Sequence, residues 1–263
     1  MNATAKIVRY EARNVARSRW MVGYGAFFLV ASFALLRFSD TEVKAALSLA
    51  NLVLAIVPLV SLVLGTMYLY DAREFTELLL AQPVGRGAMY AGLYLGLALP
   101  LTAALLAGAG IPLVLLGGDG SLASGALLTL LGTGVVLTWI FLALALLIAV
   151  RVEERARGLG VALAVWLLAT VLYDGLILLA VGAFADYPLE RPLIGVVLAN
   201  PADLARVVVL LRFDIGALMG YTGAIFERFF GSFWGTALAV GALALWLAIP
   251  LAVGARSFCR RDF

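Results

Sequence analysis

The sequence predicts an all-α protein that crosses a membrane several times, and three observations carry this prediction. Hydrophobic residues make up 64% of the 263 residues, and charged residues only 13%, about half of the usual globular share. The mean hydropathy is +1.05. The apolar residues gather in six runs, each close to the roughly 20 residues that a helix needs to cross a bilayer. A water-soluble domain could not bury this much apolar surface.

The six predicted spans belong to one transmembrane domain, residues 1–263. They cover residues 20–36, 45–70, 90–116, 122–150, 158–184 and 234–255. Pro100 and Pro112 are expected to interrupt the third span, because proline removes a helical hydrogen bond. The start of the chain lacks a convincing cleavage pattern, so the first span is expected to be retained.

Residues 2–19 have the pattern of a basic amphipathic helix that lies along the membrane surface. One stripe is basic and the opposite stripe is apolar. The basic stripe consists of Lys6, Arg9, Arg13 and Arg17, and the apolar stripe of Ala5, Val8, Ala12, Val15 and Ala16. The alternative is a positive tail that only orients the protein. It explains the charge but not the two-sided pattern.

The distribution of basic residues predicts the orientation. Most of the 19 lysines and arginines fall in segments that six spans would place on one face, namely residues 2–19, 71–86, 151–157 and 256–261. Short cytoplasmic loops carry such an excess. Both termini are therefore expected in the cytoplasm.

Residues 185–231 carry too many charges for a simple seventh span. We expect short helices on the outer face that partly dip into the membrane, with a re-entrant hairpin as the alternative. Asn200-Pro201 signals a turn, and Asp203 is expected to cap the helix that follows.

Residues 71–86, DAREFTELLLAQPVGR, place charge between two long apolar runs. Asp71 and Glu74 suit a helix N-terminus, and Pro83 would end the helix. A plain linker would not need so many apolar side chains outside the bilayer, so we expect a cytoplasmic helix on which another protein docks. The residues assigned to this docking are Asp71, Arg73, Glu74, Phe75, Glu77, Leu78, Leu79, Gln82, Pro83 and Arg86.

The missing residue types limit the chemistry. The chain has no His, the commonest metal ligand and general base. Neither Lys6 nor Lys44 follows a phosphate-binding glycine loop, and Cys259 is the one cysteine. We therefore expect no catalytic residue, no metal, no cofactor bound by this chain and no nucleic-acid partner. The chain is not expected to be an enzyme.

Two further patterns are candidates for function or packing. Asp174, beside Tyr173, lies inside a predicted span, where a carboxylate usually faces a cavity or a partner. These two residues are candidates for a substrate or gating pathway, and a structural hydrogen bond is the alternative. The spacing of Gly92 and Gly96 would allow close helix packing or dimerisation, although a chain with 27 glycines also produces it by chance.

The residues after the second span resemble a motif of the membrane subunits of ABC-2-type transporters, E-x-L-L-L-x-x-P-[VI]-x-R. The matching stretch is Glu77-Leu78-Leu79-Leu80-Ala81-Gln82-Pro83-Val84-Gly85-Arg86, and Phe75-Thr76 replaces the usual Gly-Thr before the Glu. Within that family the chain is most similar to the permeases of the transporter that matures nitrous oxide reductase. That similarity lies in Arg155-Ala156-Arg157-Gly158-Leu159-Gly160, Trp166, Leu172-Tyr173-Asp174, Asn200-Pro201-Ala202-Asp203, Arg206 and Arg260-Arg261-Asp262-Phe263.

The resemblance implies a homodimer among the lipids of the bacterial inner membrane. It also implies a separate ABC ATPase subunit that holds ATP and Mg, and a periplasmic subunit. Residues 2–19 would be the elbow helix and residues 71–86 the coupling helix. The periplasmic subunit would contact Asn200, Pro201, Asp203 and Arg206.

The implied function couples ATP hydrolysis in the partner to export or mechanical transmission, for sulfur and copper assembly in nitrous oxide reductase. The alternatives are an exporter of a lipid or drug, and a force-transmitting scaffold through which no solute passes.

Overall fold

The structure is a computed structural model that describes residues 3–80, 85–116, 122–183, 190–212, 229–230 and 232–260. This part of the chain is helical throughout, with short connections. The helices are α1 (Ala3–Ala16), α2 (Arg19–Phe38), α3 (Glu42–Asp71), α4 (Arg73–Leu80), α5 (Arg86–Leu116), α6 (Leu122–Arg151), α7 (Arg155–Leu167), the π-helical turn η1 (Leu168–Leu172), α8 (Tyr173–Ala183), α9 (Glu190–Leu198), α10 (Pro201–Arg212) and α12 (Phe233–Arg260).

Six helical segments in the described residues are long and apolar enough to cross a membrane. They are Arg19–Phe38, Val43–Asp71, Arg86–Leu116, Gly125–Arg151, Arg155–Ala183 and Trp234–Arg260. The all-α class and the six spans are therefore confirmed. The fifth span consists of α7, η1 and α8, which follow one another without a break.

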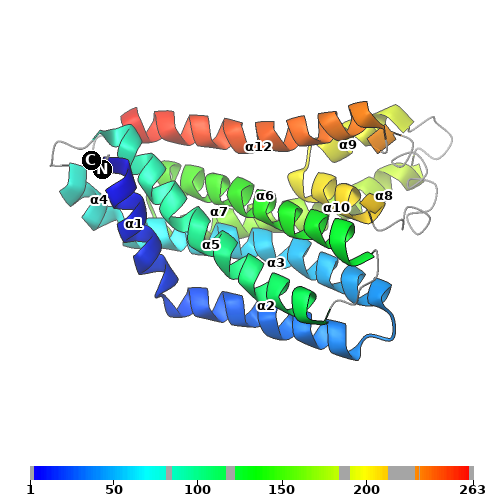
Figure 1. The fold of residues 1–263 in the computed structure, drawn as a ribbon. Helices are drawn as coiled ribbons and strands as arrows, with labels where there is room; N and C mark the ends of the chain where they lie inside the picture. Colours follow the sequence, from blue (N-terminus) through cyan, green and yellow to red (C-terminus); the bar gives the residue numbers. More distant parts are fainter. Residues whose placement is uncertain are drawn as a thin grey trace.

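The spans lie side by side, and both ends of the chain fall at the same end of the bundle (Figure 1). The helices α1 and α4 and the last turn of α12 lie at this end too. We call this end the terminal face. The other end, where α8, α9 and α10 meet, is the far face.

The centre of the bundle is formed by α3, α5 and α6, whose side chains Leu62, Leu105 and Phe141 are fully buried. Within an apolar stretch of 18 residues taken from each span, 61% is buried in α6, 11% in the fifth span and 17% in α12. The last two spans are therefore peripheral, and they expose apolar surface as lipid-facing helices do.

The expected interruption of the third span is wrong. Helix α5 runs unbroken from Arg86 to Leu116, with Pro100 and Pro112 both inside it and both buried. A membrane helix tolerates proline because neighbouring helices and small local adjustments satisfy the freed carbonyl groups.

The segment before α12 is a bent helix pair. Pro192–Leu198 and Pro201–Arg212 are bent by 109° at a short break, and α10 packs against α3, α6 and α12. Ala202 and Ala205 belong to the main core. This geometry favours the re-entrant alternative over helices that lie on the outer surface. Of the predicted outer segment, residues 185–189, 213–228 and 231 lie outside the described residues.

Candidate functional site

The connection between the second and third spans lies at the terminal face. Helix α3 extends to Asp71, Ala72 forms a turn, and α4 begins at Arg73. Asp71 was expected to cap this helix, but it is instead the last residue of α3. Its carboxylate accepts a hydrogen bond from Arg155, the first residue of α7, at 2.7 Å. Gln82 and Pro83 lie outside the described residues, as do the side chains of Glu74 and Glu77.

Helix α4 rests on the bundle with one face and exposes the other. Thr76 is 4% exposed, Leu79 packs against the main core, and Phe75 stacks on Tyr10 of α1 with the ring centroids 5.4 Å apart. Leu78 is 71% exposed. The apolar residues of α4 therefore divide: Phe75 and Leu79 hold the helix in place, and Leu78 points outward.

Arg73 lies at the start of α4, but its guanidinium reaches the end of α6. It donates hydrogen bonds to the carbonyl oxygens of Ala149 and Val152, both at 2.9 Å, and to that of Glu153 at 2.6 Å. The last carbonyl groups of a helix have no partner within the helix, and a cation there also complements the helix dipole. Arg73 thus caps α6 from a different element.

Arg86, at the other end of the same connection, makes a comparable contact. Its guanidinium donates to the carbonyl oxygen of Cys259 in the last turn of α12, at 2.8 Å. Both arginines were assigned to docking from their position in the sequence. The structure also joins them to the ends of two other spans, and sequence spacing carries no signal for such contacts.

Helix α1 is seated on α5, where two glycines leave room for it. A Cβ atom at Gly92 would collide with Ile7, and one at Gly96 with Glu11. The glycine spacing in the third span therefore serves close packing within the chain. Residues Lys6, Arg9, Arg13 and Arg17 all lie on the exposed side of this region.

The buried face of α1 contains a carboxylate that sequence reasoning missed. Glu11 lies between Ile7 and Val15 at helical spacing and is 1% exposed. Its Oε2 accepts a hydrogen bond from the Tyr68 hydroxyl of α3, and its Oε1 has no hydrogen-bond partner among the described residues. Burial raises the pKa of Glu11 above 4.5, and the Tyr68 hydrogen bond offsets part of that rise.

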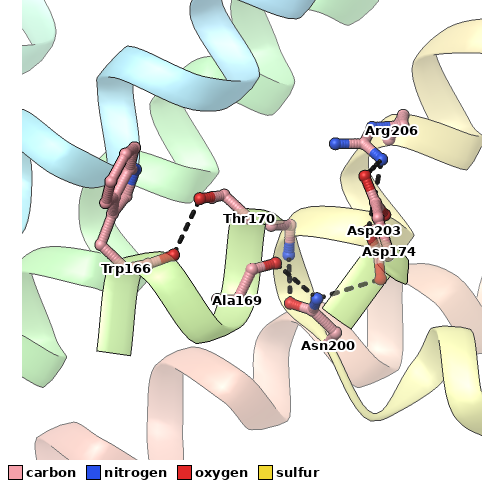
Figure 2. Close-up of polar contacts among 8 residues, drawn as sticks. Trp166, Ala169, Thr170, Asp174, Asn200, Asp203 and Arg206 are labelled. Atoms are coloured by element: carbon pink, nitrogen blue, oxygen red, sulfur yellow. Dashed lines mark hydrogen bonds and ion pairs between the residues drawn. The ribbon is translucent and has the colours of Figure 1, made fainter. Parts of the chain in front are cut away.

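A second polar cluster, consisting of Asp174, Asn200, Asp203 and Arg206, joins the fifth span to the bent pair (Figure 2). The Oδ1 of Asn200 accepts from the backbone N–H of Ala202 at 3.0 Å. Its amide donates to the carbonyl oxygen of Ala169 at 2.7 Å and to Asp203 at 3.0 Å. Asn200 is therefore the N-cap of α10, the role that was expected of Asp203, and Pro201 occupies the first helical position that proline favours.

The π-helical turn η1 provides the acceptor for Asn200. A π-turn shifts the backbone hydrogen-bond register, and the carbonyl of Ala169, within η1, accepts the Asn200 amide (Figure 2). The side chain of Asn200 thus connects the turn in the fifth span with the start of α10. No simple sequence pattern predicts this turn, although Asn-Pro marks the cap.

Arg206 completes the cluster. Its guanidinium donates to Asp174 of α8 and lies 3.6 Å from Asp203. The Tyr173 hydroxyl donates to the carbonyl oxygen of Val196 in α9 at 2.7 Å. Tyr173 and Asp174 thus make helix–helix contacts, which is the structural alternative considered for Asp174. Their part in a pathway stays a prediction.

Three of the four residues predicted to contact a periplasmic subunit are buried in this chain, and the fourth, Arg206, is 28% exposed. Asn200 and Asp203 are each 3% exposed, Pro201 is buried, and Arg206 is directed at Asp174. Contact with another subunit stays a prediction for them. No group of three or more metal-ligating side chains occurs in the described part of the chain.

Two bacterial permeases are similar in sequence to this chain over nearly its whole length. A probable ABC transporter permease protein NosY of Pseudomonas aeruginosa is 32% identical over 274 residues, 95% of this chain and 93% of that protein. A probable ABC transporter permease protein NosY of Stutzerimonas stutzeri is 29% identical over 276 residues, 97% of this chain and 95% of that protein. No protein-family model matches the chain.

The chain belongs to the ABC transporter permeases, the multi-pass membrane subunits of ABC transporters, and the permeases that it resembles are NosY proteins. An ABC permease works with an ATPase partner, which gives the exposed part of α4 a functional context.

Proposed function

We propose that this chain is the permease subunit that couples ATP hydrolysis in a separate, NosF-like ATPase to export or mechanical transmission across the bacterial inner membrane. The observation that carries the proposal is the position of α4. It is a short helix at the terminal face, fixed through Phe75 and Leu79, with Leu78 directed outward. An exposed apolar side chain on a fixed helix suits insertion into a partner's groove.

The orientation expected for the chain in the membrane supports the same proposal. The basic segments of the sequence and both chain termini gather at the face that carries α4 (Figure 1). By the positive-inside rule this face lies in the cytoplasm, where ATP and Mg are bound by the ATPase. The homodimer is proposed from the family resemblance, and the exposed apolar side chains of the peripheral fifth and sixth spans would face lipid or a second copy.

We further propose that the transporter serves sulfur and copper assembly in nitrous oxide reductase, together with a NosD-like periplasmic subunit. This part rests on the NosY relatives. Cells without the chain are expected to accumulate nitrous oxide reductase with less copper, measured by metal analysis of the purified enzyme. A full copper content in such cells would contradict this assignment.

A force-transmitting scaffold is the second candidate. It is favoured by the contacts of Asn200 and Arg206 with the fifth span, which would carry motion of that span directly to the outer segment. Transport measured on the reconstituted complex separates the candidates: ATP turnover without movement of any solute favours the scaffold.

The docking proposal is tested by Leu78→Asp. A charge in place of the exposed leucine would have to be desolvated in the partner's groove, so the ATPase is expected to be lost when the permease is purified. Arg9→Gln is the matched control, because it changes net charge by the same amount on the exposed side of α1. Recovery of the ATPase at the wild-type ratio with Leu78→Asp would contradict docking through α4.

A further inference from the structure

The contacts of Arg73 extend beyond α4 itself. Val152 and Glu153 belong to the turn between the fourth and fifth spans, which follows α6 and precedes α7. The guanidinium of Arg73 bonds both of their carbonyl oxygens and that of Ala149. A planar guanidinium offers several donors in a fixed arrangement, so one side chain can bind two carbonyl groups of the turn and one of the last turn of α6 at once.

Neighbouring residues strengthen the same contact. The Tyr70 hydroxyl donates to the carbonyl oxygen of Val152 at 2.8 Å, and the Arg73 guanidinium lies 4.4 Å from the centroid of the Tyr70 ring. Asp71 pairs with Arg155 on the other side of the turn. Hydrogen bonds from a charged donor are stronger than neutral ones, so Arg73 makes the principal contact and the others support it.

An eight-residue helix such as α4 has little stability of its own in water. Its position is set by what it binds, and through Arg73 it binds the turn at residues 152–154 directly. A displacement of α4 therefore reaches the ends of α6 and α7 without passing through the whole of α3.

We infer that Arg73 is a positioning residue that joins α4 and the 152–154 turn into one moving unit, so that a push on α4 is delivered to the fourth and fifth spans. This inference rests on the proposed function, because it takes α4 as the element that the ATPase displaces. The fifth span holds the bent pair at the far face through Asp174 and Ala169, so the same route reaches the opposite end of the molecule.

Hydrogen–deuterium exchange on the intact complex with its ATPase tests the inference. Exchange is compared without nucleotide and with ATP plus vanadate, in the peptides that cover residues 71–80 and 149–157. In the wild-type complex we expect both peptides to change with nucleotide. In Arg73→Gln we expect the 71–80 peptide to keep its change and the 149–157 peptide to lose most of it. A residue that only stabilised the fold would affect exchange equally with and without nucleotide.

The controls separate this contact from charge and folding. Arg157→Gln removes an exposed arginine of the same region, whose ion pair with Glu154 is local, and it is expected to behave as wild type. Arg73→Lys keeps the charge but loses the planar arrangement of donors, and it is expected to show a reduced change. Arg73→Lys also provides the measurement if Arg73→Gln does not assemble.

A wild-type nucleotide response at residues 149–157 in both Arg73 variants would overturn the inference and leave the proposed function standing. Absence of any response at residues 71–80 in the wild-type complex would overturn the proposed function, and the inference with it.

Discussion

Glu11 shows how one residue can reverse the interpretation of a surface helix. Among the basic residues of the N-terminal segment, a glutamate is expected to face water. It is buried because it follows Ile7 and precedes Val15 at steps of four, on the side that meets α5. The apolar stripe predicted for this helix therefore includes the buried Val15 but misses Ile7 and Glu11, which pack against the two glycines of α5.

Glu11 predicts a specific pH dependence. Its pKa in the folded protein lies above 4.5, so the folded state binds the proton more tightly than the unfolded state does. The contribution of Glu11 to stability is then fully present at acid pH and is lost as the pH rises through the raised pKa. Glu11→Gln carries no charge at any pH, so we expect a higher unfolding temperature than wild type at neutral pH and no difference at acid pH.

This expectation is measured by thermal unfolding in detergent across the pH range. Tyr68 is the titratable side chain that the structure gives as a hydrogen-bond partner of Glu11, and Tyr68→Phe is the companion variant. It removes the bond that favours the charged form, so its loss of stability should be larger at neutral than at acid pH. If the unfolding temperatures of wild type and Glu11→Gln changed with pH in parallel, Glu11 would not have a raised pKa in the folded protein.

At the scale of elements, the contact between α1 and α5 depends on the absence of two side chains. A Cβ at Gly96 has no room beside Glu11, whereas one at Gly87, in the first turn of the same helix, meets nothing within 4 Å. Gly96→Ala is therefore expected to weaken the seating of α1 by about 1–3 kcal/mol, the usual cost of overpacking. Gly87→Ala should be neutral or slightly stabilising.

Trypsin provides the measurement for this pair. Arg13 and Arg17 are exposed near the end of α1, and cleavage there requires the helix to separate from the bundle and unfold locally. Faster cleavage in Gly96→Ala than in Gly87→Ala is expected. Equal cleavage rates in the two variants would show that the packing of α1 on α5 does not depend on Gly96.

The elements that could be predicted are those whose signal is local. Six apolar runs of sufficient length predict six spans. A short helix was also expected after the second span, and α4 lies there, although Asp71 ends α3 and does not cap α4. The prolines of α5 were misinterpreted because the rule for helices in water was applied to a helix in a membrane.

The contacts between elements could not be predicted in the same way. Arg73 and Arg86 were seen as charges of a docking helix, and their bonds to the ends of α6 and α12 join residues far apart in the sequence. The N-cap at Asn200 could have been predicted from the sequence, because Asn followed by Pro is a strong signal for the start of a helix. The acceptor at Ala169 was not, since the π-turn in η1 has no composition of its own.

At the scale of the whole molecule, the proposed orientation in the membrane can be tested by labelling the native cysteine. Cys259 is exposed and lies in the last turn of α12, at the terminal face. A membrane-impermeant maleimide is expected to label it in inside-out vesicles and not in intact spheroplasts. Labelling from the outside would place α4 away from ATP and contradict the coupling proposal.

Asp40→Cys in a Cys259→Ser background is the matched control. Asp40 is exposed and belongs to the connection between α2 and α3. This connection lies at the far face (Figure 1). It should show the opposite labelling pattern, accessible in spheroplasts and protected in sealed inside-out vesicles.

The seat of α1 also has a consequence for biosynthesis. The ribosome makes α1 before α5, and the glycines on which α1 rests follow 85 residues after their contacts, since Gly92 meets Ile7 and Gly96 meets Glu11. Before α5 is made, α1 has no packing partner there, and a basic amphipathic helix is expected to stay at the lipid surface with Glu11 in contact with water. Docking of the first helix is thus a late step of maturation, and Glu11 loses its water only after the third span has entered the bilayer.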